Sequence, residues 1–223
     1  MHKAIIFDTE TTGLVNPDII EAAWIEISSP KNTIIVEEFT RRYKPSKIIE
    51  LGALATHHIL DEELADCEPS SEFRLPVSCE YIIGHNIDFD WNAIGNPEVK
   101  RICTKALSRW LLPLLDSHSQ SSLIYYFHRD RARSLLRNAH SALADVNNCR
   151  LVLISLLYLI TQQNIIIESW DDLWKLSEEA RVPTIMSFGK HKGESISSIP
   201  SDYKRWLSNQ TDVDPYLKLA LGK

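Results

Sequence analysis

The sequence predicts an α/β protein built on a mixed β-sheet, and three observations lead to this fold class. Three strand-like segments joined by short turns come first, which favours an antiparallel start to the sheet. A short apolar run over 81–84 then leads directly into polar residues. Helical patterns dominate the chain after that run. Strands first, helices later and one strand ending in a polar cluster are typical of an α/β domain.

The individual elements follow from the spacing of the apolar residues. We expect strands over 4–7, 19–27, 33–43 and 81–84, with Pro30-Lys31-Asn32 as one of the turns. We expect helices over 50–55, 61–65, 100–115, 121–127 and 142–161. The predicted architecture is therefore a mixed sheet flanked by helices.

The composition shifts near residue 165, which predicts a separate tail. Ser169 and Asp172 form a capping-box pattern that opens a short helix, and Pro183 follows this helix. A further helix carrying Trp206 is expected near 202–208. We divide the chain into a main domain over 1–165, a linker with a short helix over 166–183 and a small C-terminal module over 184–223.

Composition and charge exclude several classes of protein. Of the 223 residues 44% are hydrophobic and 24% charged, so the chain can bury a core and is neither disordered nor collagen-like. The net charge of −6 argues against a simple basic nucleic-acid binder. The most apolar run, 151–160, is about half as long as a membrane span, and no signal-peptide pattern opens the chain. Four widely spaced cysteines without a CxxC pair predict reduced thiols. We expect a cytoplasmic protein with no membrane role.

Asp8 and Glu10 lie two positions apart at the end of the first strand. Side chains at this spacing share one face of a strand, so the two acids are presented together. The spacing alone is uninformative, because Asp61 and Glu63 repeat it at an acid-rich helix start. Two solvated acids at a strand end are the alternative interpretation.

Two longer motifs carry more information. His85-Asn86-x-x-Phe89-Asp90 follows the run over 81–84, and His140-x-x-x-x-Asp145 lies at the start of the last long helix. Together with the two strand acids, in this order, they resemble the DEDD superfamily of 3′→5′ exonucleases over about residues 4–160. The motif with a histidine five residues before the last aspartate resembles that of the DEDDh branch. The other branch has tyrosine where this chain has Ser141.

The resemblance implies a ribonuclease H-like fold and hydrolysis of phosphodiesters with two metal ions. It implies that two Mg²⁺ ions, which Mn²⁺ can replace, bind at Asp8, Glu10, Asp90 and Asp145. It also implies that His140 is the general base, a role suited to a side chain that titrates near neutrality. A surface histidine beside a helix cap is the alternative for His140.

The resemblance further implies contacts to the substrate. The positions that match those around the terminal nucleotide are Thr11, Gly13, Leu14, His57 and Asn86. For His57, a solvated turn between helices is the alternative. Asp88 is expected to be a solvated bystander, and Glu21 a structural residue.

Basic residues are unevenly distributed. Segment 101–150 holds eight basic and three acidic residues, and Arg129, Arg131, Arg133 and Arg137 cluster just before His140. A solvated loop and a track for the nucleic-acid backbone are both open interpretations of this cluster.

The C-terminal module contains a second basic feature. Gly189-Lys190-His191-Lys192-Gly193 forms a cationic turn, and the tail resembles that of one bacterial group of these exonucleases. Lys190 and Lys192 are candidate contacts to DNA phosphates. The nearby aromatic residues are expected to form a small core.

These features predict a metal-dependent 3′→5′ exodeoxyribonuclease that releases 5′-mononucleotides in DNA repair or processing. Its partners would be single-stranded or duplex DNA 3′ ends, and RNA is a further candidate because the catalytic residues do not read the 2′-hydroxyl. Two alternatives stay open: an RNA-trimming exonuclease of the same branch, and a non-catalytic, polymerase-associated binder of nucleic-acid ends. The sequence carries no prediction of the oligomeric state.

Overall fold

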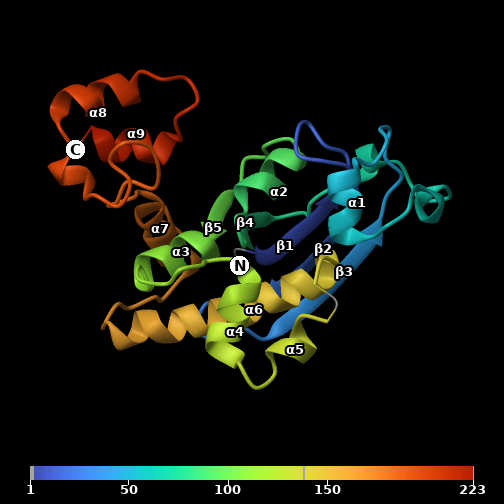
Figure 1. Ribbon diagram of the computed structural model, residues 1–223. Helices are drawn as coiled ribbons and strands as arrows, with labels where there is room; N and C mark the ends of the chain where they lie inside the picture. Colours follow the sequence, from blue (N-terminus) through green and yellow to red (C-terminus); the bar gives the residue numbers. More distant parts are fainter. Residues whose placement is uncertain (1–2, 138, 223) are drawn as a thin grey trace.

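A five-stranded mixed sheet is the centre of the computed structural model, which describes residues 3–137 and 139–222. The strands are β1 (Lys3–Thr11), β2 (Ile19–Ile27), β3 (Ile35–Arg42), β4 (Cys79–Gly84) and β5 (Lys100–Cys103). Their order is β3-β2-β1-β4-β5, in which β1, β2 and β3 are antiparallel neighbours and β4 and β5 run parallel to β1. The predicted α/β class and the antiparallel start are confirmed (Figure 1).

Helices cover the sheet and continue into the tail. They are α1 (Leu51–His57), α2 (Asp88–Ala93), α3 (Thr104–Leu111), α4 (Gln120–His128), α5 (Ala132–Leu135), α6 (Ala142–Gln162), α7 (Trp170–Arg181), α8 (Ser201–Ser208) and α9 (Pro215–Leu221). Short 3₁₀ turns occur at Asp61–Leu64, Ser70–Glu72 and Ile196–Ser198. Helix α6 lies along β1 and β2 and contacts α3 and α4, whereas α2 lies on the other side of β1 (Figure 1).

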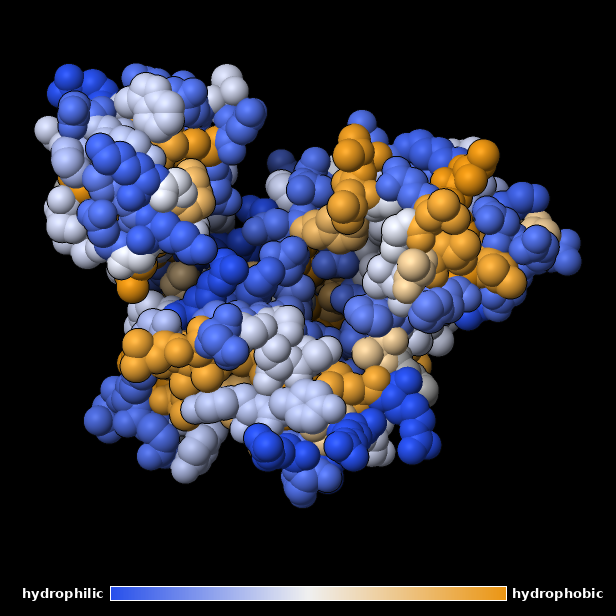
Figure 2. Space-filling view, in the orientation of Figure 1, coloured by the Kyte–Doolittle hydropathy of each residue, from blue (hydrophilic) through white to orange (hydrophobic). Residues whose placement is uncertain are grey.

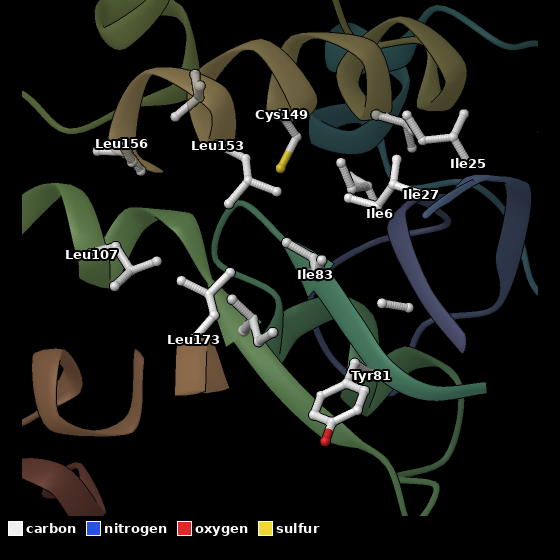
Figure 3. Packing of buried hydrophobic residues seen from close by; sticks show 14 of the residues in the cluster. Ile6, Ile25, Ile27, Tyr81, Ile83, Leu107, Cys149, Leu153, Leu156 and Leu173 are labelled. Carbon is white, nitrogen blue, oxygen red and sulfur yellow. The ribbon is translucent and has the colours of Figure 1, made fainter. Parts of the chain in front are cut away.

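Alternation along β1 divides the core into two layers. Ile6 belongs to the cluster that α6 covers, whereas Ile5 and Phe7 belong to the cluster on the opposite face. Figure 3 shows Cys149 and Leu153 of α6 pointing toward the strands that carry the first cluster. The two faces of one strand therefore support two different layers of helices.

Helix α6 is long and apolar enough, by length and composition alone, to cross a membrane. Its buried residues Val146, Val152, Leu156 and Ile160 pack in the main core of the domain. The core helix of a globular domain passes the same test of length and composition. The packing against the sheet accounts for the apolar character of α6.

The prediction of a helix over 100–115 is wrong in its first part. Lys100–Cys103 forms β5, and α3 begins only at Thr104. A four-residue strand followed at once by a helix shows no clear period, so the parallel pairing with β4 decides its structure. Helices α2, α5 and α9 were not predicted for a similar reason, since they have only six, four and seven residues.

The chain beyond α6 contains two parts with different packing. Helix α7 contacts α3 and β5, and its Leu173 and Leu176 join the main core. The predicted capping box is present, because Ser169 Oγ accepts the Asp172 N–H at 3.2 Å. The residues after α7 have a core of their own, which contains Met186, Ile196, Ile199, Leu207, Leu217, Ala220 and Leu221. Helix α7, which lies in the predicted linker, thus packs against the main domain. The division of the chain into domains stays a prediction.

All four cysteines are free thiols. Cys103 and Cys149 are buried, and burial raises the pKa of Cys79 to about 12. A protonated thiol is a poor metal ligand and a poor nucleophile. The four cysteines thus form no disulfide framework, and Cys103 and Cys149 contribute to the buried core.

We expect Leu153→Ala to lower the free energy of unfolding by about 2–5 kcal/mol, because it leaves a cavity between α6 and the sheet. Leu114→Ala is the matched control, since the Leu114 side chain is 98% exposed and its removal should change stability by less than about 0.5 kcal/mol. Urea unfolding followed by circular dichroism measures both variants. Equal effects of the two substitutions would contradict the packing described for α6.

Candidate active site

Asp8 and Glu10 lie at the carboxyl end of β1, on the face that α6 covers. Ile6 precedes them on this face, so the strand alternation carries both acids toward the start of α6. Asp145, in the first turn of α6, meets them there. One carboxylate oxygen from each of the three acids lies within 4.8 Å of the others. The structure thus brings three of the four predicted acids into one cluster.

Asp90, the fourth predicted acid, reaches the site from α2 and is held against β1. Thr9, which lies between the two strand acids, donates its backbone N–H at 2.9 Å and its hydroxyl at 2.7 Å to Asp90 Oδ1. Asp90 is only 5% exposed. It is fixed next to the three-acid cluster, close enough for its charge to raise the pKa of Asp8.

Glu21 on β2 determines where α6 begins. Its Oε2 accepts the backbone N–H of Ala142, the first residue of α6, at 2.9 Å, and its Oε1 accepts from Arg42 Nε at 3.1 Å. A carboxylate at a helix N-terminus satisfies a free N–H and interacts favourably with the helix dipole. Because Glu21 pairs with Glu10 in the sheet, it places the start of α6 beside the acidic cluster. The geometry agrees with the structural role expected for Glu21.

His140 lies in the loop just before α6, with its side chain exposed. Its backbone adopts a positive φ of 68°, and its N–H donates to Asp145 Oδ2 at 2.9 Å. Gln120, at the start of α4, donates to Asp145 Oδ1 at 3.0 Å. The structure therefore places His140 beside Asp145 and adds Gln120 to the site. No sequence pattern indicates Gln120, because it lies 25 positions before its partner.

His85, the first residue of its motif, is a structural residue. Its Nδ1 lies 3.0 Å from Thr104 Oγ1 and its Nε2 2.9 Å from the His118 carbonyl. Burial lowers the pKa of His85 to about 4. The next residue, Asn86, is exposed and has a φ of 71°, which turns the chain from β4 toward α2. The motif therefore joins β4 to α2 and brings Asp90 to the site.

Burial and mutual repulsion raise the pKa values of the acids. Burial is the main cause for Asp8, whose pKa lies well above its ordinary value, and Asp90 and Asp145 add repulsion. Burial, with repulsion from Asp145, raises the pKa of Glu10 to about 8. Burial raises the pKa of Asp90 to about 7, although the Thr9 donors act in the opposite direction. Burial also raises the pKa of Asp145.

The acidic cluster fits a divalent cation. Within residues 3–137 and 139–222, no lysine or arginine forms an ion pair with any of the four acids. Buried carboxylates without a cationic partner are costly. Mg²⁺ and Mn²⁺ prefer oxygen ligands of this kind, and a bound cation would offset the repulsion between them.

The last residue of β1 and the segment that follows it carry three of the predicted substrate contacts. Thr11 is buried and donates its hydroxyl to the Gly13 carbonyl at 2.9 Å. A Cβ on Gly13 would lie 2.4 Å from the Glu50 carboxyl carbon, so the absence of a side chain allows this close approach. Leu14 is 80% exposed. The structure places these three residues directly after the strand acids.

The other predicted contacts are more scattered. His57 is buried, its Nδ1 accepts the Ile59 N–H at 3.0 Å, and burial lowers its pKa. His58 beside it is exposed. Lys190 and Lys192 are exposed in the turn of the C-terminal module, which lies apart from the start of α6 in Figure 1. The structure therefore does not bring the two lysines into the acidic cluster.

Asp88 is not a solvated bystander, and that expectation is wrong. Its Oδ1 pairs with Arg101 at 2.6 Å, and its Oδ2 pairs with Arg181. Arg181 also lies over the Tyr216 ring, with 5.2 Å to the ring centre. These contacts tie α2 to β5, α7 and α9, which the sequence could not show because the partners are distant in the chain. Asp88 thus helps to fix the helix that carries Asp90.

We expect the metal-free protein to lose stability as the pH rises from about 5 to about 8. The folded pKa of Glu10 is about 8 and that of Asp90 about 7, both above their ordinary values, so the folded state binds more protons than the unfolded state in this window. Glu10→Gln should flatten the decrease, whereas Glu38→Gln, at an exposed acid on β3, should not. Thermal unfolding in EDTA between about pH 5 and pH 8 measures the stability of the wild type and both variants. A wild-type stability that increased with pH would refute the expectation.

Known nucleases and polymerases are similar in sequence to this chain. No family model matches the chain. Exodeoxyribonuclease 10 of Escherichia coli K12 is 28% identical over 222 residues, which cover 97% of this chain and 96% of that protein. The PolC-type DNA polymerase III of Staphylococcus haemolyticus is 32% identical over 96 residues, 40% of this chain and 6% of the polymerase.

Solved structures of exonucleases have a fold similar to that of this chain. Exonuclease X in complex with 5′ overhanging duplex DNA matches with a TM-score of 0.54 and 23% identity, over 77% of this chain and 99% of that one. Escherichia coli exonuclease I in complex with a dT13 oligonucleotide matches with a TM-score of 0.62 and 15% identity, over 96% of this chain and 61% of that one. The predicted resemblance is confirmed: the chain is similar to exodeoxyribonuclease 10 over almost its whole length, and it has the ribonuclease H-like fold of exonucleases X and I.

Proposed function

We propose that this protein is a metal-dependent 3′→5′ exodeoxyribonuclease that releases 5′-mononucleotides from DNA ends in DNA repair or processing. The observation that carries the proposal is the convergence of Asp8, Glu10 and Asp145 beside the exposed His140. A relative that matches almost the whole chain is an exodeoxyribonuclease. We also propose a cytoplasmic location, where DNA and a reducing environment for the four free cysteines are both present.

Mg²⁺ is the proposed cofactor, with two ions per site and Mn²⁺ as a substitute. Asp8, Glu10 and Asp145 would hold one ion, and Asp90 with Asp8 the other. When bound, the ions supply an activated water and stabilise the negative charge that develops on the phosphate oxygens. The pKa values of the acids support this role, since the charged forms need a cationic partner in the buried site.

His140 is the proposed general base. Its exposed imidazole can accept the proton of the attacking water and pass it to solvent. The hydrogen bond from its backbone N–H to Asp145 keeps the loop at the acidic cluster while leaving the ring free. The positive φ of His140 supports this arrangement, because a residue other than glycine rarely adopts this backbone conformation unless the surrounding contacts hold it there.

The terminal nucleotide is proposed to lie against Thr11, Gly13 and Leu14. This segment directly follows the strand acids, and the exposed Leu14 offers an apolar surface for the terminal base. His57 would act from beneath this segment, since it is buried, and Asn86 from the turn before α2. Lys190 and Lys192 of the C-terminal module (184–223) are proposed to contact backbone phosphates farther from the site.

The proposal for DNA is supported by the relatives, of which exonuclease X is solved with duplex DNA and exonuclease I with oligonucleotides. We expect the protein to release mononucleotides from 3′-labelled DNA only with Mg²⁺ or Mn²⁺, and to degrade a matched RNA strand more slowly. A panel of single-stranded DNA, duplex DNA and RNA, with metal or with EDTA, measures this. Preferential RNA trimming would favour the RNA-trimming alternative, and no product from any strand would favour the non-catalytic binder.

We expect Asp8→Ala to abolish turnover and His140→Ala to reduce the rate by about 10²–10⁴-fold while metal binding is retained. Asp61→Ala is the matched control, because Asp61 and Glu63 repeat the spacing of the strand acids at an exposed turn. Single-turnover rates and Mn²⁺ binding, measured separately, distinguish the two roles. Full activity in either site variant would contradict the assignment.

A further inference from the structure

An exposed surface on α4 and α5 combines aromatic and basic side chains. Tyr125 and Tyr126, on α4, are 44% and 53% exposed. Arg129, Arg131, Arg133 and Arg137 follow on the α4–α5 turn, on α5 and beyond it, and all four are exposed. Figure 2 shows strongly hydrophilic side chains gathered over this part of the molecule, below its central hollow. We call these six residues the α4–α5 surface.

The arginines of this surface are unpaired within the described residues. None of the four forms an ion pair with an acid there, whereas Arg41 and Arg42 on β3 are both paired with glutamates. The surface therefore presents a local positive charge on a chain whose net charge is −6. Such a charge is complementary to a phosphate backbone.

The surface begins at the proposed active site. Gln120, the first residue of α4, bonds Asp145, and Tyr125 and Tyr126 follow about 8–9 Å farther along the helix axis. At the other end of the surface, Arg137 lies three residues before His140. A strand whose 3′ end sits at the acids could therefore continue over α4 and α5 without leaving the protein.

The tyrosine rings are suited to stacking. Tyr126 is held edge-on against Phe127, with ring centres 5.0 Å apart, so its position is partly fixed before any ligand binds. Exposed aromatic faces beside cations are the common device for binding single strands, because every unpaired base has a face on which a ring can stack. Bases in a duplex already stack on one another and cannot use such rings.

We propose that the α4–α5 surface binds the unpaired strand on the 5′ side of the terminal nucleotide. The two tyrosines stack on its bases and the four arginines contact its phosphates. The inference rests on the proposed function for the direction of the strand, and it assigns single-stranded DNA as the substrate form held beyond the active site.

Binding to a labelled single strand in EDTA tests the surface without any turnover. We expect Tyr125→Ala with Tyr126→Ala to weaken binding by about tenfold or more, and Tyr→Phe at both positions to restore it. The effect should vanish on an abasic strand of equal length. Tyr158→Ala, at a 64% exposed tyrosine near the far end of α6, is the matched control. Unchanged affinity of the double variant would overturn the stacking proposal.

Salt dependence tests the arginines separately. Neutralising all four to glutamine should reduce the slope of log K against log salt by about 0.7 for each phosphate that the protein no longer neutralises. Arg41→Gln, which removes an exposed arginine from β3, should leave the slope unchanged. An unchanged slope in the fourfold variant, or an equal reduction on blunt duplex DNA, would overturn the proposal for a single strand.

A length series separates this inference from the proposed function. If the enzyme is active, the variants should have a lower kcat/KM on a long single strand but degrade a dinucleotide like the wild type. Equal reductions on both substrates would place the surface in the active site itself and overturn the inference. If no substrate is degraded, the proposed function fails, while the binding measurements still decide the role of the surface. Circular dichroism confirms that each variant is folded.

Discussion

The concentration of negative charge at the end of β1 is the constraint on which the rest of the structure depends. Asp8, Glu10, Asp90 and Asp145 come from three separate elements, and burial raises the pKa of each. Like charges repel strongly in a poorly solvated site, so these acids would move apart if nothing else held them. The fold must therefore hold them together by other contacts. Among the described residues those contacts come from neutral or backbone donors, which leaves the negative charge available to a metal ion.

Three sets of hydrogen bonds hold the acids in place. Glu21 fixes the first N–H of α6 and so the position of Asp145, and Thr9 fixes Asp90 through two donors. The backbone N–H of His140 closes the loop onto Asp145. The donors of Thr9 and His140 constrain Asp90 and Asp145 without neutralising them, since an N–H or hydroxyl donor stabilises a carboxylate but adds no formal charge. Glu21 acts indirectly, because it accepts from the backbone of α6. The carboxylates are thus held in fixed positions and keep their negative charge. A site for divalent cations requires both properties.

The sheet could be predicted from local patterns, whereas the convergence of Asp8, Glu10 and Asp145 followed from the resemblance of the three motifs. The alternation through Ile6 and Asp8 indicates the face of the strand directly, and the His140 motif indicates the start of α6. Prediction failed where long-range pairing decides: Lys100–Cys103 is a strand only because β4 lies beside it, and Asp88 is ion-paired only because its arginine partners come from other elements. Gln120 was missed for the same reason. Pattern reasoning identifies the residues that carry chemistry more readily than those that position them.

The net charge of −6, taken alone, argues against nucleic acid as a partner, and the structure explains why this argument fails. Part of that charge is concentrated in the four acids, where two divalent ions would neutralise it. Four of the eight basic residues of 101–150 lie on the α4–α5 surface, in the stretch of chain just before His140. Charges of both signs are therefore segregated rather than mixed. The proposed path for the phosphate backbone and the proposed cation site therefore occupy separate parts of the protein that meet near His140.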